Sequence, residues 1–515
     1  MELGTVIATQ DGPSPFGFSF IVRDGVKVGL NRFVKVEVEG EWLFGHVTNV
    51  VRTNRYFERP DAVWEYERGG GLRAVFPTEM WGYSIASVRA VGVWKDGVLR
   101  RPVFPPAPGQ VVHDLAEEEL KAVLGLDEGG LEIGTMDERG MAVRLNPTRL
   151  LQKHLAILAM SGAGKSNCAR VLVEELLRRG RGRPALVIFD VHGEYSDLAS
   201  SFRGRVRAVR AEDVRIGVPE MTIWHFREFL PEMSGSQARD LSQILAELRS
   251  QLRTFGMEDV IERLRENERV NRNVRAALEG WLSDLQSLGI FGREEWPRWE
   301  EMKPGTAVIV DMGRITSLTK KQILLTYIAD RLFLLRRKGL IPPTVLVVEE
   351  AHTFAPTESA ISKHVLETIA REGRKFFMSL VVISQRPVRL SATLLSQTST
   401  NMILRITNPY DLEHIKRSSE MMSGEMIDTI PGLAVGEALV VGEAVNFPIF
   451  VRIRRSPTAS SGSSFEEAAE IYELSVRSSE RLMVETSEQS SSFSMDSGGS
   501  TRSSTYSSIT ADRSM

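Results

Sequence analysis

The stretch HLAILAMSGAGKSNCARVLVEELL, residues 154–177, decides the fold class of this chain. It opens with an apolar run that ends at Ala159 and continues through small residues. At Lys165 and Ser166 it passes into a segment with the periodicity of an amphipathic helix. A buried strand followed by a glycine-containing turn and a helix is the setting of a phosphate-binding loop. The stretch therefore predicts a nucleotide site at the start of a helix.

The residues of this turn suit the binding of phosphate groups. Backbone N–H groups of a small-residue loop can surround a phosphate, and the helix N-terminus adds roughly half a positive charge. We expect Lys165 to reach the β- and γ-phosphates of ATP and the Ser166 hydroxyl to hold Mg²⁺. The usual pattern begins with Gly, and Ala159 is a conservative departure from it. The alternative is a strand-to-helix turn that binds nothing. The predicted nucleotide-binding residues are Ser161, Gly162, Ala163, Gly164, Lys165, Ser166 and Asn167.

The segment TVLVVEEAH, residues 344–352, supplies the acidic element that an ATPase needs. Two carboxylates at the end of an apolar strand are costly to bury unless they have a role. We expect Glu349 to bind Mg²⁺ through its water shell and Glu350 to polarise the attacking water. The alternative is a pair of solvated loop carboxylates just past the strand. His352 is expected to pack or to form hydrogen bonds rather than to act as a base.

Two more apolar segments end in polar residues. SLVVISQRP, residues 379–387, ends at Gln385, whose amide can bond the γ-phosphate or the lytic water; the alternative is a strand cap. LVIFDVHGEYSDL, residues 186–198, puts Asp190 at a strand end, where open α/β sheets carry ligand residues. We expect Asp190 and Glu194 near the nucleotide, and turn chemistry alone is the alternative. A guanine-specific NKxD element is absent, so adenine is the default base.

Three textures divide the chain. Residues 1 to about 100 alternate in strand fashion, with Val34, Val36 and Val38 on one face, and glycine-rich breaks predict a small β-barrel. From about residue 130, short apolar runs alternate with helical segments, as in a parallel sheet covered on both faces. Between those runs lies a segment with helical periodicity and no strand candidate. The fold class is α/β, with a barrel at 1–105, a core at 106–230 and 300–455, an inserted helical bundle at 231–299, and a C-terminal extension at 456–515.

The C-terminal extension has its own composition. Ser464 and Glu467 have the spacing of a capping box, which predicts a short helix. The chain then becomes rich in serine, and we expect disorder after about residue 487 because such a segment buries too little apolar surface to fold.

Composition excludes several classes of protein. The 515 residues suggest about three units, and no apolar run approaches the roughly 18–20 residues that cross a bilayer, which excludes a membrane transporter. The first residues, MELGTVIATQDG, lack a secretory signal, so we expect a soluble, cytoplasmic protein. The single cysteine, Cys168, excludes an internal disulfide, and a structural zinc site is not expected. A net charge of −3 leaves room for a local basic channel that binds DNA.

These elements together resemble the HerA family of hexameric DNA-translocating ATPases, which is related to FtsK and, more distantly, to the RecA-like motors. The residues that carry the resemblance are 154–166, DVHGEYS at 190–196, VVEEAHTFAP at 347–356, IAREGRKF at 369–376, ISQRP at 383–387 and LRITNPYDLEHI at 404–415. The resemblance implies an amino-terminal barrel like that of the rotary ATP synthase subunits and a RecA-like core with an inserted helical bundle. It also implies a homohexameric ring around double-stranded DNA that uses ATP and Mg²⁺. A NurA-type nuclease is the implied partner, in DNA end resection for recombinational repair.

Ring motors also need a cation from the neighbouring subunit at the transferring phosphoryl group. The candidates are Arg374, Lys375, Arg405 and Lys153. We rank Arg374 and Arg405 above Lys153, because an ammonium lacks the forked geometry of a guanidinium. For contacts to DNA phosphates we single out Lys320, Lys321, Lys363 and Arg371, which flank the motor strands. A solvated helix face explains each of these four equally well.

The sequence favours an ATP-driven translocase or helicase acting on double-stranded DNA as a homohexamer. Two alternatives stay open: a conjugation- or packaging-type pump for single-stranded DNA or protein, and a regulatory scaffold ATPase. Stimulation of ATP hydrolysis by duplex DNA separates the first reading from the pump. Nucleotide binding without turnover would favour the scaffold.

Overall fold

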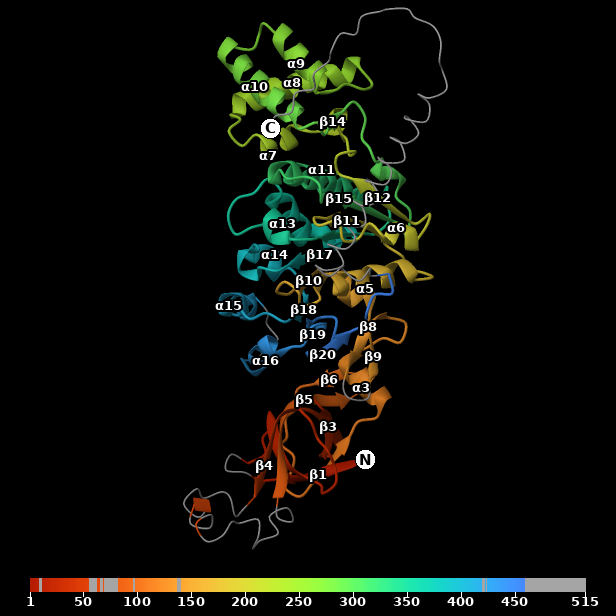
Figure 1. Ribbon diagram of the computed structural model, residues 1–515, viewed down its shortest axis with the longest axis vertical. Helices are drawn as coiled ribbons and strands as arrows, with labels where there is room; N and C mark the ends of the chain where they lie inside the picture. The colour runs from red at the N-terminus through yellow and green to blue at the C-terminus, as the bar shows by residue number, and fades with distance from the viewer. Residues whose placement is uncertain are drawn as a thin grey trace, which may run out of the picture. The chain divides into compact units, whose positions relative to one another are not determined.

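The computed structural model describes residues 1–8, 12–54, 82–95, 98–136, 140–418 and 424–458, together with residues 63, 64, 68 and 422 (Figure 1). The described residues belong to one compact unit, which spans Met1–Ala459. The helix expected at Ser464 and Glu467 and the disorder expected after about residue 487 lie outside the described residues. Within the described part, none of the helices has the length and hydropathy of a membrane span.

The amino-terminal residues form the predicted β-barrel. Its strands are β1 (Glu2–Ile7), β2 (Gly17–Val22), β3 (Phe33–Val38), β4 (Glu41–Asn54), β5 (Gly82–Lys95), β6 (Val98–Arg100) and β7 (Val111–Asp114). They follow the order β2-β1-β7-β3-β4-β5-β6, and an additional pairing of β2 with β5 closes the barrel. The alternation that predicts β3 is present, since Val34 and Val36 are fully buried and Val38 is 7% exposed. These valines pack in the barrel interior with Leu3 and Phe20.

The barrel extends beyond the boundary at residue 105. β7 pairs antiparallel with both β1 and β3, so it belongs to the barrel. The proline-dense stretch 102–108 interrupts the strands because proline has no N–H to donate. At Gly109 and Gln110 the chain returns to the same sheet, where the backbone of Val6 bonds to both residues. The prolines therefore mark a loop within the barrel rather than its end.

The core is built on one large mixed sheet. Its strands are β8 (Leu131–Met136), β9 (Met141–Leu145), β10 (Leu155–Leu158), β11 (Ala185–Asp190), β12 (Val206–Arg210), β15 (Ala307–Asp311), β16 (Thr344–Val348), β17 (Met378–Ser384), β18 (Thr400–Leu404), β19 (Glu437–Gly442) and β20 (Ile449–Ile453). The order is β12-β15-β11-β16-β17-β10-β18-β19-β20-β8-β9. Pairing is parallel from β12 to β18 and antiparallel from β18 to β9. The predicted α/β class is confirmed.

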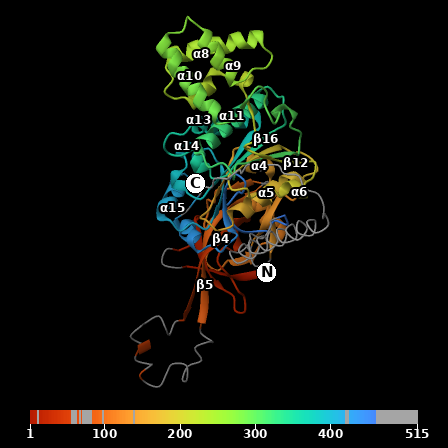
Figure 2. The ribbon, with the colours of Figure 1, turned by 45° about the horizontal axis from the view of Figure 1, so that its top comes forward.

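Helices cover both faces of this sheet (Figures 1 and 2). Leu155 and Ile157 of β10 belong to the apolar cluster of α5 (Lys165–Arg178). Ala156 and Leu158 belong to the cluster of α11 (Leu318–Arg337) and α13 (Lys363–Glu372). Burial on both faces explains why β10 is apolar at every position. Outside the inserted segment, the other α-helices of the described residues are α3 (Glu117–Leu124), α4 (Pro147–Leu151), α6 (Leu198–Ser201), α7 (Ile223–Phe229), α12 (Ala351–Phe354), α14 (Ala392–Ser396), α15 (Pro409–Ser418) and α16 (Gly424–Thr429).

The inserted segment is helical in its centre. It contains α8 (Gly235–Gln251), α9 (Met257–Glu266) and α10 (Arg272–Ser287). The side chain of Ser234 accepts the Gln237 N–H and starts α8. Near its end lies the short strand β14 (Phe291–Gly292), although no strand was expected in 231–299; it pairs with β13 (Ile216–Gly217). Two residues are too few to leave a strand periodicity in the sequence.

His154 joins the start of β10 to the rest of the core. It has a φ of 66° and is 1% exposed. Its Nδ1 accepts the Leu380 N–H at 3.0 Å, so Nε2 carries the proton and donates to the Ala370 carbonyl at 2.9 Å. Both ring nitrogens are used by the neutral form, and burial lowers the pKa of His154 to about 4.

Acid should therefore destabilise the core through His154. The unfolded imidazole, with a pKa near 6.5, binds a proton that the folded one does not, so stability falls as the pH drops from about 6.5 towards 4. Between pH 6.5 and 5 the loss amounts to about 2 kcal/mol. Urea unfolding of the wild type and of His154→Asn at pH 7 and pH 5 measures it. His46, whose pKa burial also lowers to about 4, contributes equally to both proteins. An identical pH dependence of the two proteins would contradict the assignment.

Candidate active site

The phosphate-binding loop connects β10 to α5 at the carboxyl edge of the sheet. Gly162 and Gly164 have φ angles of 76° and 101°, which residues other than glycine rarely adopt. A Cβ on Gly164 would lie 3.3 Å from the Cα of Gly436, which packs against the loop. The Gly436 N–H donates to the Ala163 carbonyl at 3.0 Å. The loop thus needs glycine for its conformation and for this close approach.

The neighbouring strands hold the start of the loop. The Ala159 N–H donates to the carbonyl of Ser384 at the end of β17, at 3.1 Å. The Met160 N–H donates to the carbonyl of Arg405, just past β18, at 3.0 Å. Because both flanking strands contribute an acceptor, the loop keeps a fixed position relative to the sheet.

Lys165 and Glu350 form an ion pair at this edge. Lys165 Nζ lies 2.7 Å from Glu350 Oε1, and the two side chains are 11% and 5% exposed. Glu350 precedes α12 with a φ of 46° and a ψ of 42°. A non-glycine residue in this left-handed region is strained, and such strain is concentrated at functional sites. The Thr353 N–H donates to the Glu350 carbonyl at 2.7 Å and supports the turn.

Glu349 is the buried partner of Glu350. It is fully buried; its Oε2 accepts the Val191 N–H at 3.3 Å, whereas its Oε1 has no hydrogen-bond partner among the described residues. Burial and then the charge of Asp190 raise the pKa of Glu349 to about 8, against the opposing effect of Lys165. A buried carboxylate oxygen without a hydrogen-bond partner, close to the carboxylates of Asp190 and Glu194, fits a cation.

Asp190 organises the turn after β11. Its Oδ1 accepts the N–H groups of Gly193 and Glu194 at 2.8 and 3.0 Å, and its Oδ2 accepts that of Tyr195 at 2.9 Å. Burial raises the pKa of Asp190, and the three hydrogen bonds oppose that shift. The Glu194 side chain is exposed. The contacts of Asp190 are those of turn chemistry, and its predicted catalytic role stays a prediction.

His352 bridges two strand ends, consistent with the expected hydrogen-bonding role. Its Nδ1 lies 3.2 Å from the Ser384 hydroxyl and 3.4 Å from Glu350 Oε2. Burial lowers the pKa of His352. The same Ser384 hydroxyl accepts the Arg386 N–H at 3.1 Å. The residues around Gln385 are therefore linked to Glu350 through His352.

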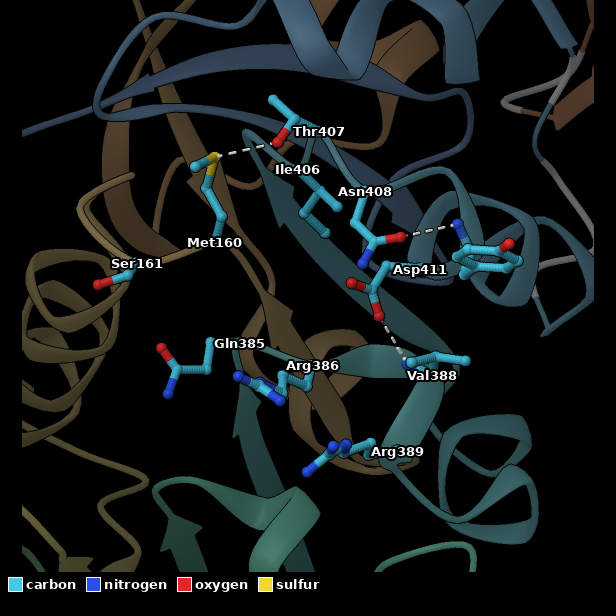
Figure 3. Close-up of a pocket in the computed structure, with 11 residues that line it drawn as sticks. Met160, Ser161, Gln385, Arg386, Val388, Arg389, Ile406, Thr407, Asn408 and Asp411 are labelled. Atoms are coloured by element: carbon cyan, nitrogen blue, oxygen red, sulfur yellow. Dashed lines mark hydrogen bonds between the residues drawn. The ribbon is translucent and has the colours of Figure 1, made fainter.

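A hollow of about 620 Å³ opens beside the phosphate-binding loop (Figure 3). Gln385, Arg386 and Arg389 lie on one side of it, opposite Met160 and Thr407. Both guanidinium groups belong to exposed residues, and neither has a carboxylate within salt-bridge distance in the described part of the chain. We did not single out these arginines from the sequence, although Arg386 follows Gln385 directly.

The chain is similar to known DNA helicases. Residues 131–332 match the family model for the central domain of helicase HerA. A DNA double-strand break repair helicase HerA from Pyrococcus furiosus is 28% identical over 430 residues, which cover 72% of this chain and 77% of that protein. This chain is therefore similar to HerA helicases over most of its length. A probable helicase from Methanocaldococcus jannaschii is 27% identical over 506 residues, covering 92% of this chain and 94% of that protein.

A solved structure supports the fold of this chain. VirB4 of Thermoanaerobacter pseudethanolicus has a TM-score of 0.51 and 19% sequence identity, and the match covers 64% of this chain and 98% of VirB4.

Asn167, predicted to bind the nucleotide, uses its side chain elsewhere. Its Nδ2 donates to the Arg454 carbonyl and its Oδ1 accepts the Ser456 N–H, both at 2.9 Å. Only the Asn167 backbone N–H, in the first turn of α5, is left for a phosphate.

The candidate cations for the transferring phosphoryl group lie at opposite edges of the sheet. Arg374 belongs to the 3₁₀ turn Gly373–Phe376 that leads into β17. β17 runs parallel to β10 and ends beside the phosphate-binding loop, so Arg374 lies roughly 20 Å away along the strand. Arg405 lies at the same edge as the loop. Lys153 precedes β10 at the far edge, paired with Glu443.

The four residues singled out for DNA do not form one group. Lys320 and Lys321 lie in the first turn of α11, and burial lowers the pKa of Lys321. Lys363 begins α13, and its ammonium donates to two backbone carbonyls of the preceding loop, at 2.8 and 2.9 Å. Arg371, near the end of α13, lies 3.9 Å from Glu367. Lys320 and Lys321 are thus the pair nearest to one another.

Proposed function

We propose that this chain hydrolyses ATP and uses the reaction to move along double-stranded DNA as a homohexameric ring. The observation that carries the proposal is the buried Lys165–Glu350 pair beside Glu349, next to a glycine-dependent loop at a helix start. The names of the relatives, which are helicases of DNA double-strand break repair, support a role on DNA. We further propose that it acts in DNA end resection, with a NurA-type nuclease as the partner.

In this proposal Lys165 has two successive partners. Without nucleotide its ammonium neutralises Glu350. When ATP binds, the ammonium turns to the β- and γ-phosphates, and the Glu350 carboxylate becomes free to orient a water and accept its proton. Binding of the substrate would therefore itself prepare the base. Gln385, at the adjacent strand end, is suited to bond the same water or the γ-phosphate.

Ser166 and Glu349 fit a magnesium ion. A hydroxyl in the first turn of the helix and a carboxylate oxygen without another partner are the oxygen ligands that Mg²⁺ prefers. The ion would neutralise charge on the phosphates during transfer. Glu349 would hold it, and Asp190 would keep the neighbouring turn in position.

A cation from a second copy would complete each site. The parallel register of β17 and β10 supports this, because it keeps Arg374 away from the loop of its own chain. Arg374 is therefore our candidate for the residue supplied by a neighbouring subunit, whereas Arg405 would act within its own subunit. A site completed in this way makes hydrolysis depend on ring assembly.

DNA would be held through its phosphates. Arg386 and Arg389 beside Gln385, and Lys320 and Lys321 on α11, supply cations at the carboxyl edge of the sheet. Backbone contacts give little sequence preference, and the affinity falls as salt rises. The link from Ser384 through His352 to Glu350 would let bound DNA influence hydrolysis.

The proposal is tested by ATPase rates without DNA, with single strands and with linear duplex. We expect duplex DNA to stimulate the wild type, and Lys165→Ala to lower the rate by at least about 10²-fold, because the phosphates lose their ammonium. Lys338→Ala, which removes an exposed ammonium from the end of α11, should hydrolyse like the wild type. Native mass measurement checks that all three proteins assemble alike. A wild-type rate in Lys165→Ala would refute the site, and stimulation by single strands alone would favour the pump.

A further inference from the structure

The polar face of α5 carries charges that the proposed reaction does not use. Asn167, Arg170 and Glu174 follow one another at helical spacing, so they share a face. Arg170 is 5% exposed and Glu174 is fully buried. Charged groups so deeply buried need partners, because an unpaired buried charge is strongly destabilising.

Glu174 lies 3.4 Å from Arg178 of the same helix, and its other partners come from the strap, which we define as residues 454–458 following β20. The Ser456 and Thr458 hydroxyls both donate to Glu174 Oε1. The side chain of Asn167 bonds the strap backbone at two points, as described above. Arg454 Nη2 lies 2.8 Å from Glu175 on the same helix. The strap is therefore held on α5 by side chains at successive turns of that helix.

Arg170 ties the strap to a second segment. Its Nη2 donates to the Thr458 carbonyl at 2.8 Å and to Asp197 Oδ2 at 2.7 Å. Its Nη1 donates to the Glu194 carbonyl. Asp197 starts α6, which lies beside α5 in both views (Figures 1 and 2). One buried guanidinium thus joins the phosphate-binding helix, the strap and the turn that Asp190 organises.

We propose that Arg170 and Glu174 are positioning residues of the nucleotide site and that the strap keeps them in place. α5 begins with Lys165 and Ser166, and the turn lies next to Glu349, so the position of both segments decides whether the loop and the acidic pair face one nucleotide. This inference rests on the proposed function.

The strap then affects nucleotide affinity through the fraction of molecules in which it is closed. An open strap removes the Thr458 carbonyl from Arg170 and both hydroxyls from Glu174, which leaves α5 held to the turn by fewer contacts. The apparent affinity then falls in proportion to the competent fraction. Linkage is reciprocal, so bound nucleotide must favour the closed strap by the same factor.

The first test compares two full-length double variants of the strap. Ser456→Ala with Thr458→Val removes both hydroxyls from Glu174, and we expect the KM for ATP to rise at least about fivefold with little change in kcat, since hydrogen bonds to a charged group are lost. Ser456→Thr with Thr458→Ser keeps both hydroxyls and should restore the wild-type KM. A KM within twofold of wild type in the first variant, or equal impairment in both, would overturn the proposal.

The second test measures the strap without changing it. Hydrogen exchange of the amides of residues 454–458 in the wild type should slow when a non-hydrolysable ATP analogue binds. Lys165→Ala, which lacks the phosphate contact, should show no slowing. Unchanged exchange in wild-type protein saturated with the analogue would overturn the inference. The proposed function is tested separately: it fails if Lys165→Ala hydrolyses ATP at the wild-type rate. If only the strap variants behave like the wild type, the strap inference fails and the proposed function stands.

Discussion

Glutamine in place of Glu350 is expected to lower kcat for ATP hydrolysis by about three orders of magnitude while ATP still binds. The amide keeps the size of the side chain and its contact with Lys165, but it cannot accept the proton of the attacking water. A positioned general base contributes typically 10²- to 10⁴-fold. Single-turnover hydrolysis, together with equilibrium binding of a fluorescent ATP analogue, separates the chemical step from binding.

A matched control is available on the surface. Glu128 is exposed in the turn before β8, and Glu128→Gln makes the same chemical change far from the phosphate-binding loop. We expect it to hydrolyse ATP like the wild type. If Glu350→Gln kept kcat within tenfold of wild type, Glu350 could not be the base, and its strained backbone and its pairing with Lys165 would need another explanation.

Two inactive variants are expected to recover activity when they are mixed. Arg374→Ala and Lys165→Ala should each lose about 10³-fold in rate, because one removes the cation at the transferring group and the other the phosphate contact. In co-expressed rings, some sites combine two different copies. Such a site is intact when an Arg374→Ala copy supplies the phosphate-binding loop and a Lys165→Ala copy supplies Arg374. Random assembly produces such a site at about one quarter of the interfaces. ATPase rates of the purified mixed rings measure the recovery.

Arg405 provides the contrast for this experiment. Its carbonyl accepts a hydrogen bond from the phosphate-binding loop of its own chain, so we expect it to act within its own subunit. Rings that mix Arg405→Ala with Lys165→Ala should stay inactive, because every site lacks one of the two groups. If the Arg405→Ala mixture recovered ATPase activity and the Arg374→Ala mixture did not, Arg405 would be the residue supplied by the neighbouring subunit and Arg374 would not.

Local patterns predicted much of the fold and the acidic pair. β10, the phosphate-binding loop and α5 are contiguous in the sequence, and each has the periodicity or composition of its conformation. Glu349 and Glu350 are recognisable because an apolar strand precedes them directly. The buried valines of β3 follow from alternation alone. Signals of this kind need no knowledge of distant residues.

Other features depend on contacts between distant segments. The pairing of Lys165 with Glu350 and the left-handed backbone of Glu350 follow from the order of the strands, which periodicity does not determine. The strap on α5 joins residues almost 300 positions apart, such as Asn167 and Ser456. The prolines before β7 interrupt the strand pattern, so the sequence did not indicate that β7 belongs to the barrel. Arg374 and Arg405 lie at opposite edges of the sheet because of the register of β17 and β18 against β10, which the sequence pattern does not determine.

We propose above all that this chain turns ATP hydrolysis into movement along double-stranded DNA. The most direct measurement is displacement of a triplex-forming oligonucleotide from a linear duplex, followed over time with the triplex at increasing distances from the DNA end. We predict displacement that requires ATP, is delayed in proportion to that distance, and is absent in Lys165→Ala. Hydrolysis stimulated by duplex DNA without any displacement, or displacement with no dependence on distance, would contradict the claim.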